Sequence, residues 1–173
     1  MVFNFISSPV FYLRPMVKED IPKLNRLMIP LYYPNFWESD ECLLSKINAF
    51  PQGCLVVEDT TKIIGYVFSH PWKSDILVEL NNQIKIPERP DCYYIHDIAV
   101  DFNYRQMGIG KLLLGKVLII AKECSLDKIK LVSVLNSYGF WSRLGFSDVE
   151  EVKYGDGQKG HVMVGRLENL CVN

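Results

Sequence analysis

Apolar residues recur along the chain at two spacings, and these spacings predict helices and strands in a mixed order. Ile21, Leu24, Leu27 and Met28 lie three or four residues apart, so they mark one face of a helix that Pro30 ends. Further helices are predicted at 108–124 and 136–144. Runs rich in β-branched and apolar residues predict strands at 12–15, 54–58, 63–70, 93–100, 128–134, 146–153 and 161–167.

The segments between these elements carry weaker signals. A second helix is expected to begin after Ser39, with Leu43 and Ile47 facing the core and Lys46 facing solvent. Pro71 is expected to close the strand at 63–70. We also expect a short helical piece at 75–80 and a mobile glycine-rich turn at 154–160.

The order of elements is strand, two helices, three strands, helix, strand, helix and two strands. It is neither a strict alternation nor all-β, so it predicts an α/β or mixed α+β fold. We expect a mixed sheet of about six or seven strands with about four helices on its faces. The 173 residues fit one domain better than two, with a core at about 11–167.

Composition and charge exclude several classes of protein. Hydrophobic residues make up 49% of the chain and the formal net charge is −1, which argues against a disordered chain and against bulk attraction to nucleic acid or anionic membranes. The longest apolar run, 112–121, is shorter than the roughly 20 residues that span a bilayer. The N-terminus does not resemble a secretory signal. The five cysteines have no C-x-x-C spacing, so no disulfide scaffold or metal site is expected, and the compartment is predicted to be cytoplasmic or else nuclear.

The residues that suggest chemistry follow the strand that ends at Ile98-Ala99-Val100. Arg105 to Lys111 forms a glycine-containing turn that opens a helix. Helix N-termini carry unpaired N–H groups and partial positive charge, and Gly108 and Gly110 allow close approach to them. Because Arg105 and Lys111 add positive charge at the same place, the segment suits a pyrophosphate.

Three other interpretations of this turn exist, of which the residues fit the first weakly and fail the second. A dinucleotide fingerprint needs a third glycine in register and an acidic residue about 20 residues later. A Walker A loop needs Ser or Thr after Gly-Lys, whereas Gly110-Lys111 is followed by Leu112. Two glycines can also lie at an ordinary helix start without any ligand.

Two motifs together resemble the GCN5-related N-acetyltransferases, or GNAT family. Arg105-x-x-Gly108-x-Gly110 resembles the family's acetyl-CoA-binding pattern of Arg or Gln, two residues, Gly, one residue, and Gly or Ala. Residues 136–146 are similar to its next motif, an Asn-led helix with two aromatic residues before a final Gly-Phe. The similarity covers residues 12–167, and it implies a strongly twisted sheet of the acyl-CoA N-acyltransferase fold.

The resemblance implies where acetyl-CoA would bind. In the family two adjacent parallel strands splay apart around the cofactor, and here these would be 93–100 and 128–134. A bulge near 96–98 would free the backbone groups of Ile98 and Val100 for the pantetheine arm. The implied cofactor-binding residues are Ile98, Ala99, Val100, Arg105, Gln106, Met107, Gly108, Ile109, Gly110, Lys111, Asn136, Phe140 and Trp141.

The implied reaction is direct transfer of an acetyl group from acetyl-CoA to an amine. The amine must lose a proton, and we expect Asp97 as the first candidate base and His96 as the second. Strand alternation would place these two side chains on opposite faces, unless a bulge changes the parity. The family commonly carries a tyrosine acid where this sequence has Trp141, so Tyr138, one helical turn earlier, is the substitute candidate.

The acceptor is expected to approach between residues 31–38 and 154–160. Tyr33, Trp37 and Glu38 are the candidate substrate-binding residues, since aromatic faces and a carboxylate suit a cationic amine. A small molecule is slightly favoured over a peptide or protein, and the chain is expected to be a monomer or a homodimer. A non-catalytic acyl-CoA-binding module is the alternative. His70 and His161 receive no role.

Overall fold

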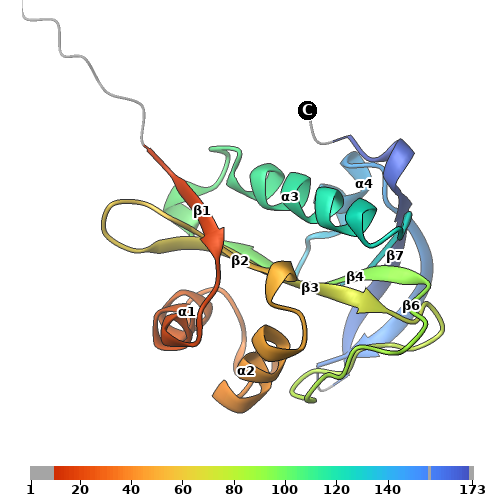
Figure 1. The fold of residues 1–173 in the computed structure, drawn as a ribbon, viewed down its shortest axis with the longest axis horizontal. Helices are drawn as coiled ribbons and strands as arrows, with labels where there is room; N and C mark the ends of the chain where they lie inside the picture. Colours follow the sequence, from red (N-terminus) through yellow and green to blue (C-terminus); the bar gives the residue numbers. More distant parts are fainter. Residues whose placement is uncertain (1–9, 156, 172–173) are drawn as a thin grey trace, which may run out of the picture.

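The computed structural model describes residues 10–155 and 157–171, which form a seven-stranded mixed sheet with helices on both faces (Figure 1). The strand order is β1-β2-β3-β4-β5-β7-β6, and the pairing is antiparallel everywhere except between β4 and β5. The strands are β1 (Tyr12–Pro15), β2 (Cys54–Glu58), β3 (Ile63–Trp72), β4 (Cys92–Val100), β5 (Lys128–Ser133), β6 (Ser147–Tyr154) and β7 (Gln158–Arg166). The α-helices are α1 (Ile21–Met28), α2 (Asp40–Ala49), α3 (Ile109–Glu123) and α4 (Tyr138–Arg143). The predicted fold class is thereby confirmed.

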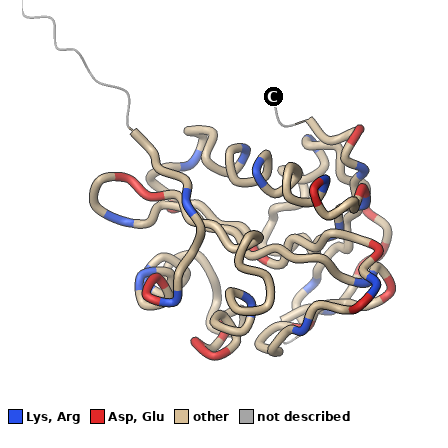
Figure 2. The backbone as a smooth tube through the Cα atoms, viewed as in Figure 1, with Lys and Arg blue, Asp and Glu red and all other residues tan. Residues whose placement is uncertain are grey.

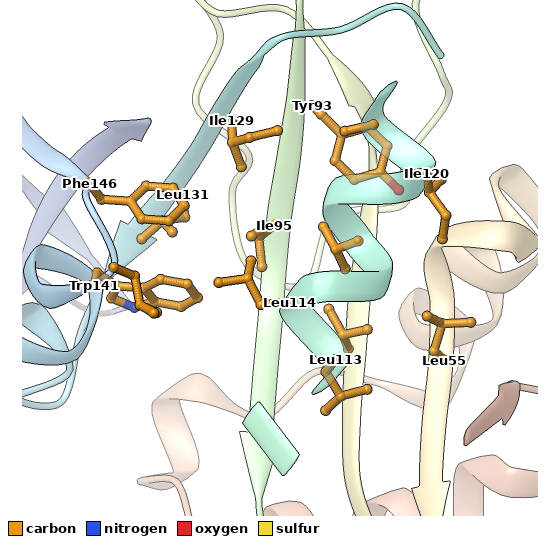
Figure 3. Packing of buried hydrophobic residues seen from close by; sticks show 14 of the residues in the cluster. Leu55, Tyr93, Ile95, Leu113, Leu114, Ile120, Ile129, Leu131, Trp141 and Phe146 are labelled. Carbon is orange, nitrogen blue, oxygen red and sulfur yellow. The ribbon is translucent and has the colours of Figure 1, made fainter. Parts of the chain in front are cut away.

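Apolar residues cover both faces of the sheet. On one face, α3 and α4 pack over the central strands, and Figure 3 shows Leu113 and Leu114 of α3 directed at this core. On the other face, α1 and α2 pack over β2 and β3 with all four predicted residues of the first helix buried. No helix within residues 10–155 and 157–171 is long and apolar enough to cross a membrane.

Helix α2 begins where the sequence predicts, but one of its side chains was assigned to the wrong side. The Ser39 hydroxyl accepts a hydrogen bond from the Cys42 N–H at 3.2 Å and caps the helix. Lys46, predicted to face solvent, is only 1% exposed. It turns inward because a buried carboxylate, Glu38, pairs with its ammonium group.

Three further boundaries differ from the prediction. Strand β3 continues through Pro71 to Trp72, with Pro71 opposite Tyr93. Residues 75–80 form no helix, and the carbonyls of Ser74 and Ile76 accept hydrogen bonds from the buried Lys130 ammonium. Strand β7 begins at Gln158, so the expected turn at 154–160 is largely strand; its residue 156 lies outside the described residues.

Strands β4 and β5 part in the middle of the sheet. They pair only through Tyr93–Ile129, Tyr94–Lys130 and Ile95–Leu131, and the last five residues of β4 have no partner on β5. On its other edge, β4 places Ile95 opposite Ser69 and Asp97 opposite Phe68. His96 is therefore the additional residue of a β-bulge at the point where the two strands diverge.

Candidate active site

The N-terminus of α3 forms an open cradle of backbone. Gly108 immediately precedes the helix in a left-handed conformation with φ +81°, and Gln106 also has a positive φ of 65°. A Cβ atom built on Gly108 would meet no atom within 4 Å, so the backbone is open to an approaching group. Because the first N–H groups of a helix have no intrahelical acceptor, this cradle can bind an anion.

The cradle is fixed to the turn between β2 and β3. Lys62 Nζ lies 2.7 Å from Asp101 Oδ2, and the Tyr104 hydroxyl donates to Asp59 Oδ2 at 2.5 Å. The Asp101 N–H also donates to the Ile64 carbonyl at 2.9 Å. These three contacts hold the segment that leads from β4 into the cradle.

Positive charge borders the cradle. Arg105 and Lys111 are both exposed, and the Arg105 guanidinium lies 4.0 Å from the centroid of the Phe102 ring. Figure 2 shows further basic positions along α3. The predicted charge of this segment is thus accessible to a ligand despite the near-zero net charge of the chain.

The remaining predicted cofactor residues lie around the divergence of β4 and β5. Ile98 and Val100 face the core under α3, whereas Ala99 faces the core under α1. Asn136 follows β5 in an exposed left-handed conformation with φ 63°. Phe140 is half-buried, and its Cζ lies 3.7 Å from the Cβ position of Gly110.

Trp141 lies in the core. It is 5% exposed and packs edge-to-face on Phe146 with 5.3 Å between ring centroids. Figure 3 shows the two side chains beside each other. This placement leaves little of the indole for contact with a cofactor.

The bulge expected near 96–98 is present in β4, and it places His96 and Asp97 on the same face of the sheet instead of the opposite faces that unbroken alternation would give. Tyr32 and Tyr66, from the side of α1 and α2, donate hydrogen bonds to the two oxygens of Asp97 at 2.6 and 2.5 Å. Glu38, which directly precedes α2, meets the His96 ring on that side too. The additional residue in the bulge shifts the side-chain parity by one.

Burial changes the acidity of the Asp97 cluster. Loss of solvent raises the pKa of Asp97, although the hydroxyls of Tyr32 and Tyr66 act in the opposite direction. Burial and the adjacent carboxylate raise the pKa of both tyrosines well above their usual range. The two hydroxyls therefore remain protonated and donate to Asp97.

A second charge cluster surrounds Glu38. Its carboxylate lies 2.9 Å from Lys46 Nζ and 3.1 to 3.2 Å from His96 Nε2, and all three side chains are at most 3% exposed. Although burial opposes ionisation, His96 and Lys46 hold the pKa of Glu38 well below its usual range. Glu38, predicted to bind substrate, thus has internal partners, and its substrate role stays a prediction.

The two segments expected on the acceptor side are in contact. Asn35 Nδ2 donates to the Gly155 carbonyl at 2.9 Å, which joins the 31–38 segment to the β6–β7 turn. Tyr33 is 65% exposed and Trp37 is 41% exposed. Of the three candidate substrate-binding residues, these two therefore present their rings to solvent.

Tyr138 lies beside β7. It is 41% exposed, and its ring centroid is 5.0 Å from that of His161, whose Nδ1 lies 2.7 Å from Asp148 Oδ2. No contact within the described residues joins Tyr138 to His96 or Asp97. Its role as an acid stays a prediction.

Tyr32, Tyr66 and Lys46 are site residues that the sequence analysis missed. Tyr66 could have been found from the sequence, since a tyrosine in a largely apolar strand must find a partner for its hydroxyl. No sequence feature indicated that Lys46 belongs to the site, because a lysine on a helix is usually solvated.

Comparison with known proteins identifies relatives of the chain. The model of the family described as "Acetyltransferase (GNAT) family" matches residues 21–146. The uncharacterized N-acetyltransferase YkwB of Bacillus subtilis is 28% identical over 134 residues, covering 68% of this chain and 58% of that protein. The chain thus spans well under two thirds of that relative's length.

Solved structures share the fold at low identity. The loading GNATL domain of CurA from Lyngbya majuscula has a TM-score of 0.77 at 16% identity, covering 92% of this chain and 98% of that domain. A chain of the NatC complex bound to Gag peptide and CoA has a TM-score of 0.71 at 18% identity, covering 90% of this chain and 98% of that one.

Proposed function

The chain belongs to the GNAT family of acetyltransferases, and from this premise we propose that it transfers the acetyl group of acetyl-CoA directly to an acceptor amine. One observation carries the proposal: an open cradle at the N-terminus of α3 adjoins the divergence of β4 and β5. A small-molecule amine is the favoured acceptor. The compartment proposed is the cytoplasm, and the protein is proposed to act as a monomer or homodimer.

The residues present fit acetyl-CoA. Backbone N–H groups of the segment from Gln106 to Lys111 would hold the pyrophosphate, with Arg105 beside them. The unpaired part of β4, including Ile98 and Val100, would bind the pantetheine amides, and Asn136 would contact the same arm. When bound, acetyl-CoA supplies the acetyl group as an activated thioester.

The bulge would supply the proton chemistry. An acceptor ammonium must lose a proton before its nitrogen can attack, and His96 and Asp97 lie together on the face where the acceptor is proposed to bind. A backbone N–H near Ile98 would stabilise the developing oxyanion.

The proposed acid is Tyr138, because Trp141 is buried in the core and an indole N–H does not transfer its proton usefully. Tyr138→Phe is expected to lower turnover at saturating acetyl-CoA without changing cofactor affinity. Steady-state rates and calorimetric binding measure the two effects separately. Unchanged turnover would remove Tyr138 from the mechanism.

The acceptor surface would consist of the exposed rings of Tyr33 and Trp37 beside the β6–β7 turn. Aromatic rings of this kind attract cationic amines. The solved NatC complex carries a peptide, so peptides are the second class of acceptor to test.

A non-catalytic acyl-CoA-binding module is a second candidate function, favoured by the buried Trp141 at the family's usual acid position. The experiment that separates the two adds acetyl-CoA and a panel of amines and peptides, and measures free thiol together with acetylated product. The proposed transfer predicts thiol release matched by product for at least one acceptor. Calorimetric binding of acetyl-CoA without release for any acceptor would favour the module.

A further inference from the structure

Glu38 fixes the position of the hydrogen on the His96 ring. His96 Nε2 lies 3.2 and 3.1 Å from the two oxygens of Glu38. An ionised carboxylate only accepts hydrogen bonds, so Nε2 must be the donor. In the neutral ring, the lone pair that accepts a proton is therefore on Nδ1.

Glu38 is itself held from several directions. Lys46 Nζ donates to both of its oxygens at 2.9 Å, and the Asn81 N–H donates to Oε1 at 2.9 Å. The Cys42 thiol adds a contact at 3.3 Å. Donors from α2 and from residues 73–91, which connect β3 to β4, thus fix the carboxylate that faces His96.

Stability alone does not account for this cluster. Burying an ion pair costs the hydration of both ions, and replacing such a pair with apolar residues is often neutral or stabilising. Lys46 and Glu38 are 1% and 3% exposed at their side chains, so they bear this cost. A buried pair that faces a histidine at a bulge is better accounted for by a role in orienting that histidine.

The two candidate bases differ in what their acceptor atoms already bind. Each oxygen of Asp97 accepts a tyrosine hydroxyl, from Tyr32 or from Tyr66. His96 Nδ1 is buried and has no hydrogen-bond partner among the described residues. Each Asp97 oxygen thus already accepts one hydrogen bond, whereas His96 Nδ1 accepts none from the described residues, so Nδ1 is the acceptor at the bulge whose lone pair is unused.

We propose that Glu38 and Lys46 are positioning residues that hold His96 with its hydrogen on Nε2, so that Nδ1 takes the proton of the acceptor amine. The proposal rests on the proposed acetyl transfer and deepens it. One N–H bond of the acceptor ammonium breaks, and its proton moves to Nδ1. The nitrogen then forms the C–N bond as the thioester C–S bond breaks, and the second proton goes to the departing sulfur.

Because Nδ1 is buried, its access to substrate requires the structure around it to move, and the proposal assigns this movement to residues 32–37. The His96 side chain is 1% exposed, although the residue as a whole is half-buried because its backbone faces the divergence of the strands. Residues 32–37 are held by two long-range hydrogen bonds, from Tyr32 to Asp97 and from Asn35 to Gly155. Glu38 is tied to α2 through Lys46, so it can stay on His96 while residues 32–37 lift.

The ring hydrogen is measured directly by imidazole ¹⁵N NMR, which needs no activity. The chain has only three histidines, and His70→Gln and His161→Gln variants assign the spectrum. We expect His96 of the wild-type protein to carry its hydrogen on Nε2. A neutral ring with the hydrogen on Nδ1 would overturn the proposal.

The kinetic test uses a charge-balanced double variant, Glu38→Gln with Lys46→Met. We expect a mixture of His96 tautomers and about a tenfold fall in kcat, with the KM of acetyl-CoA unchanged. The control is Arg14→Met with Asp20→Asn, which removes another ion pair with a buried carboxylate, at 2.7 Å, and also the 2.8 Å pair of Arg14 with Glu58. The control is expected to lose stability without changing the His96 tautomer or kcat.

The comparison of bases completes the test. His96→Asn is expected to lower kcat by about 100-fold or more, and adding the double variant is expected to lower it little further. Full activity of His96→Asn alongside an inactive Asp97→Asn would overturn the proposal and assign the base to Asp97. If the wild type acetylates no amine, the proposed function fails. The NMR experiment still tests whether Glu38 and Lys46 hold the His96 hydrogen on Nε2, because that measurement needs no activity.

Discussion

The two sides of the candidate site are built from different parts of the chain. The side proposed for the cofactor is a continuous backbone segment, from Val100 to Lys111, that is held by two side-chain contacts to the β2–β3 turn and by one backbone hydrogen bond to β3. On the side proposed for the acceptor, the groups proposed for the proton chemistry are buried and half-buried side chains brought together by the fold, with Tyr32, Glu38, Lys46 and Asp97 coming from separate segments. The backbone groups proposed to bind the cofactor thus come from one short segment of the chain, whereas the groups proposed for proton transfer depend on packing between distant segments.

This difference predicts that substitutions among the buried side chains of the acceptor side lower the free energy of unfolding most. Lys46→Met alone leaves the buried Glu38 carboxylate without its ammonium partner, and we expect it to lower the free energy of unfolding by about 3–5 kcal/mol. The double variant with Glu38→Gln removes both charges and is expected to recover much of that loss. Urea unfolding of both proteins measures the difference. Equal stability of the two variants would contradict the description of Glu38 and Lys46 as one coupled pair.

Substitution of Gly108 tests the cofactor side. Gly108→Val adds a side chain to the open cradle and strains a residue with φ +81°, so affinity for CoA is expected to fall at least about tenfold, or about 1.4 kcal/mol. Gly157→Val is the matched control, because that glycine also has a positive φ, of 80°, and open space around it. Calorimetry measures both affinities. Equal losses would show that backbone strain and not the cradle is responsible.

The acceptor side also predicts a pH dependence. Burial raises the pKa of Asp97 in the folded state, so its contribution to stability is fully present below the unfolded pKa and is lost as pH rises through the folded pKa. Asp97→Asn is therefore expected to gain stability relative to wild type as pH rises from 4 to 7. Thermal unfolding across this range checks it, and a difference that is constant with pH would contradict it.

Arg105 is expected to give the smallest effect. Backbone groups hold most of the proposed pyrophosphate contact, and the family pattern that this segment resembles accepts Gln at the same position. Arg105→Gln is thus expected to weaken CoA binding by no more than about threefold, mostly at low salt. A loss comparable to that of Gly108→Val would show that charge, and not backbone geometry, dominates this side.

The sequence predicted the fold and the cradle well for the same physical reason. Helix and strand periodicity is local, and Gly108 with its neighbours is contiguous in the chain. The fold class was confirmed, along with the start of α2 at Ser39 and the buried face of α1.

The acceptor side could not be derived in that way. Lys46 points inward because it pairs with Glu38, eight residues earlier in the chain. Glu38 in turn contacts His96 of β4, which is 58 residues away from it in sequence. The shared face of His96 and Asp97 depends on a bulge whose register only the pairing with β3 defines. Both features require the assembled sheet, so local patterns assigned Lys46 to the wrong side and left the faces of His96 and Asp97 open.

A crystal structure with acetyl-CoA bound tests the central claim most directly. We predict the pyrophosphate on the segment from Gln106 to Lys111 and the thioester between β4 and β5 beyond Ile95, with the His96 ring turned so that Nδ1 faces the acceptor side. A cofactor bound elsewhere on the sheet would contradict the account, as would a thioester carbon that faces neither His96 nor Asp97.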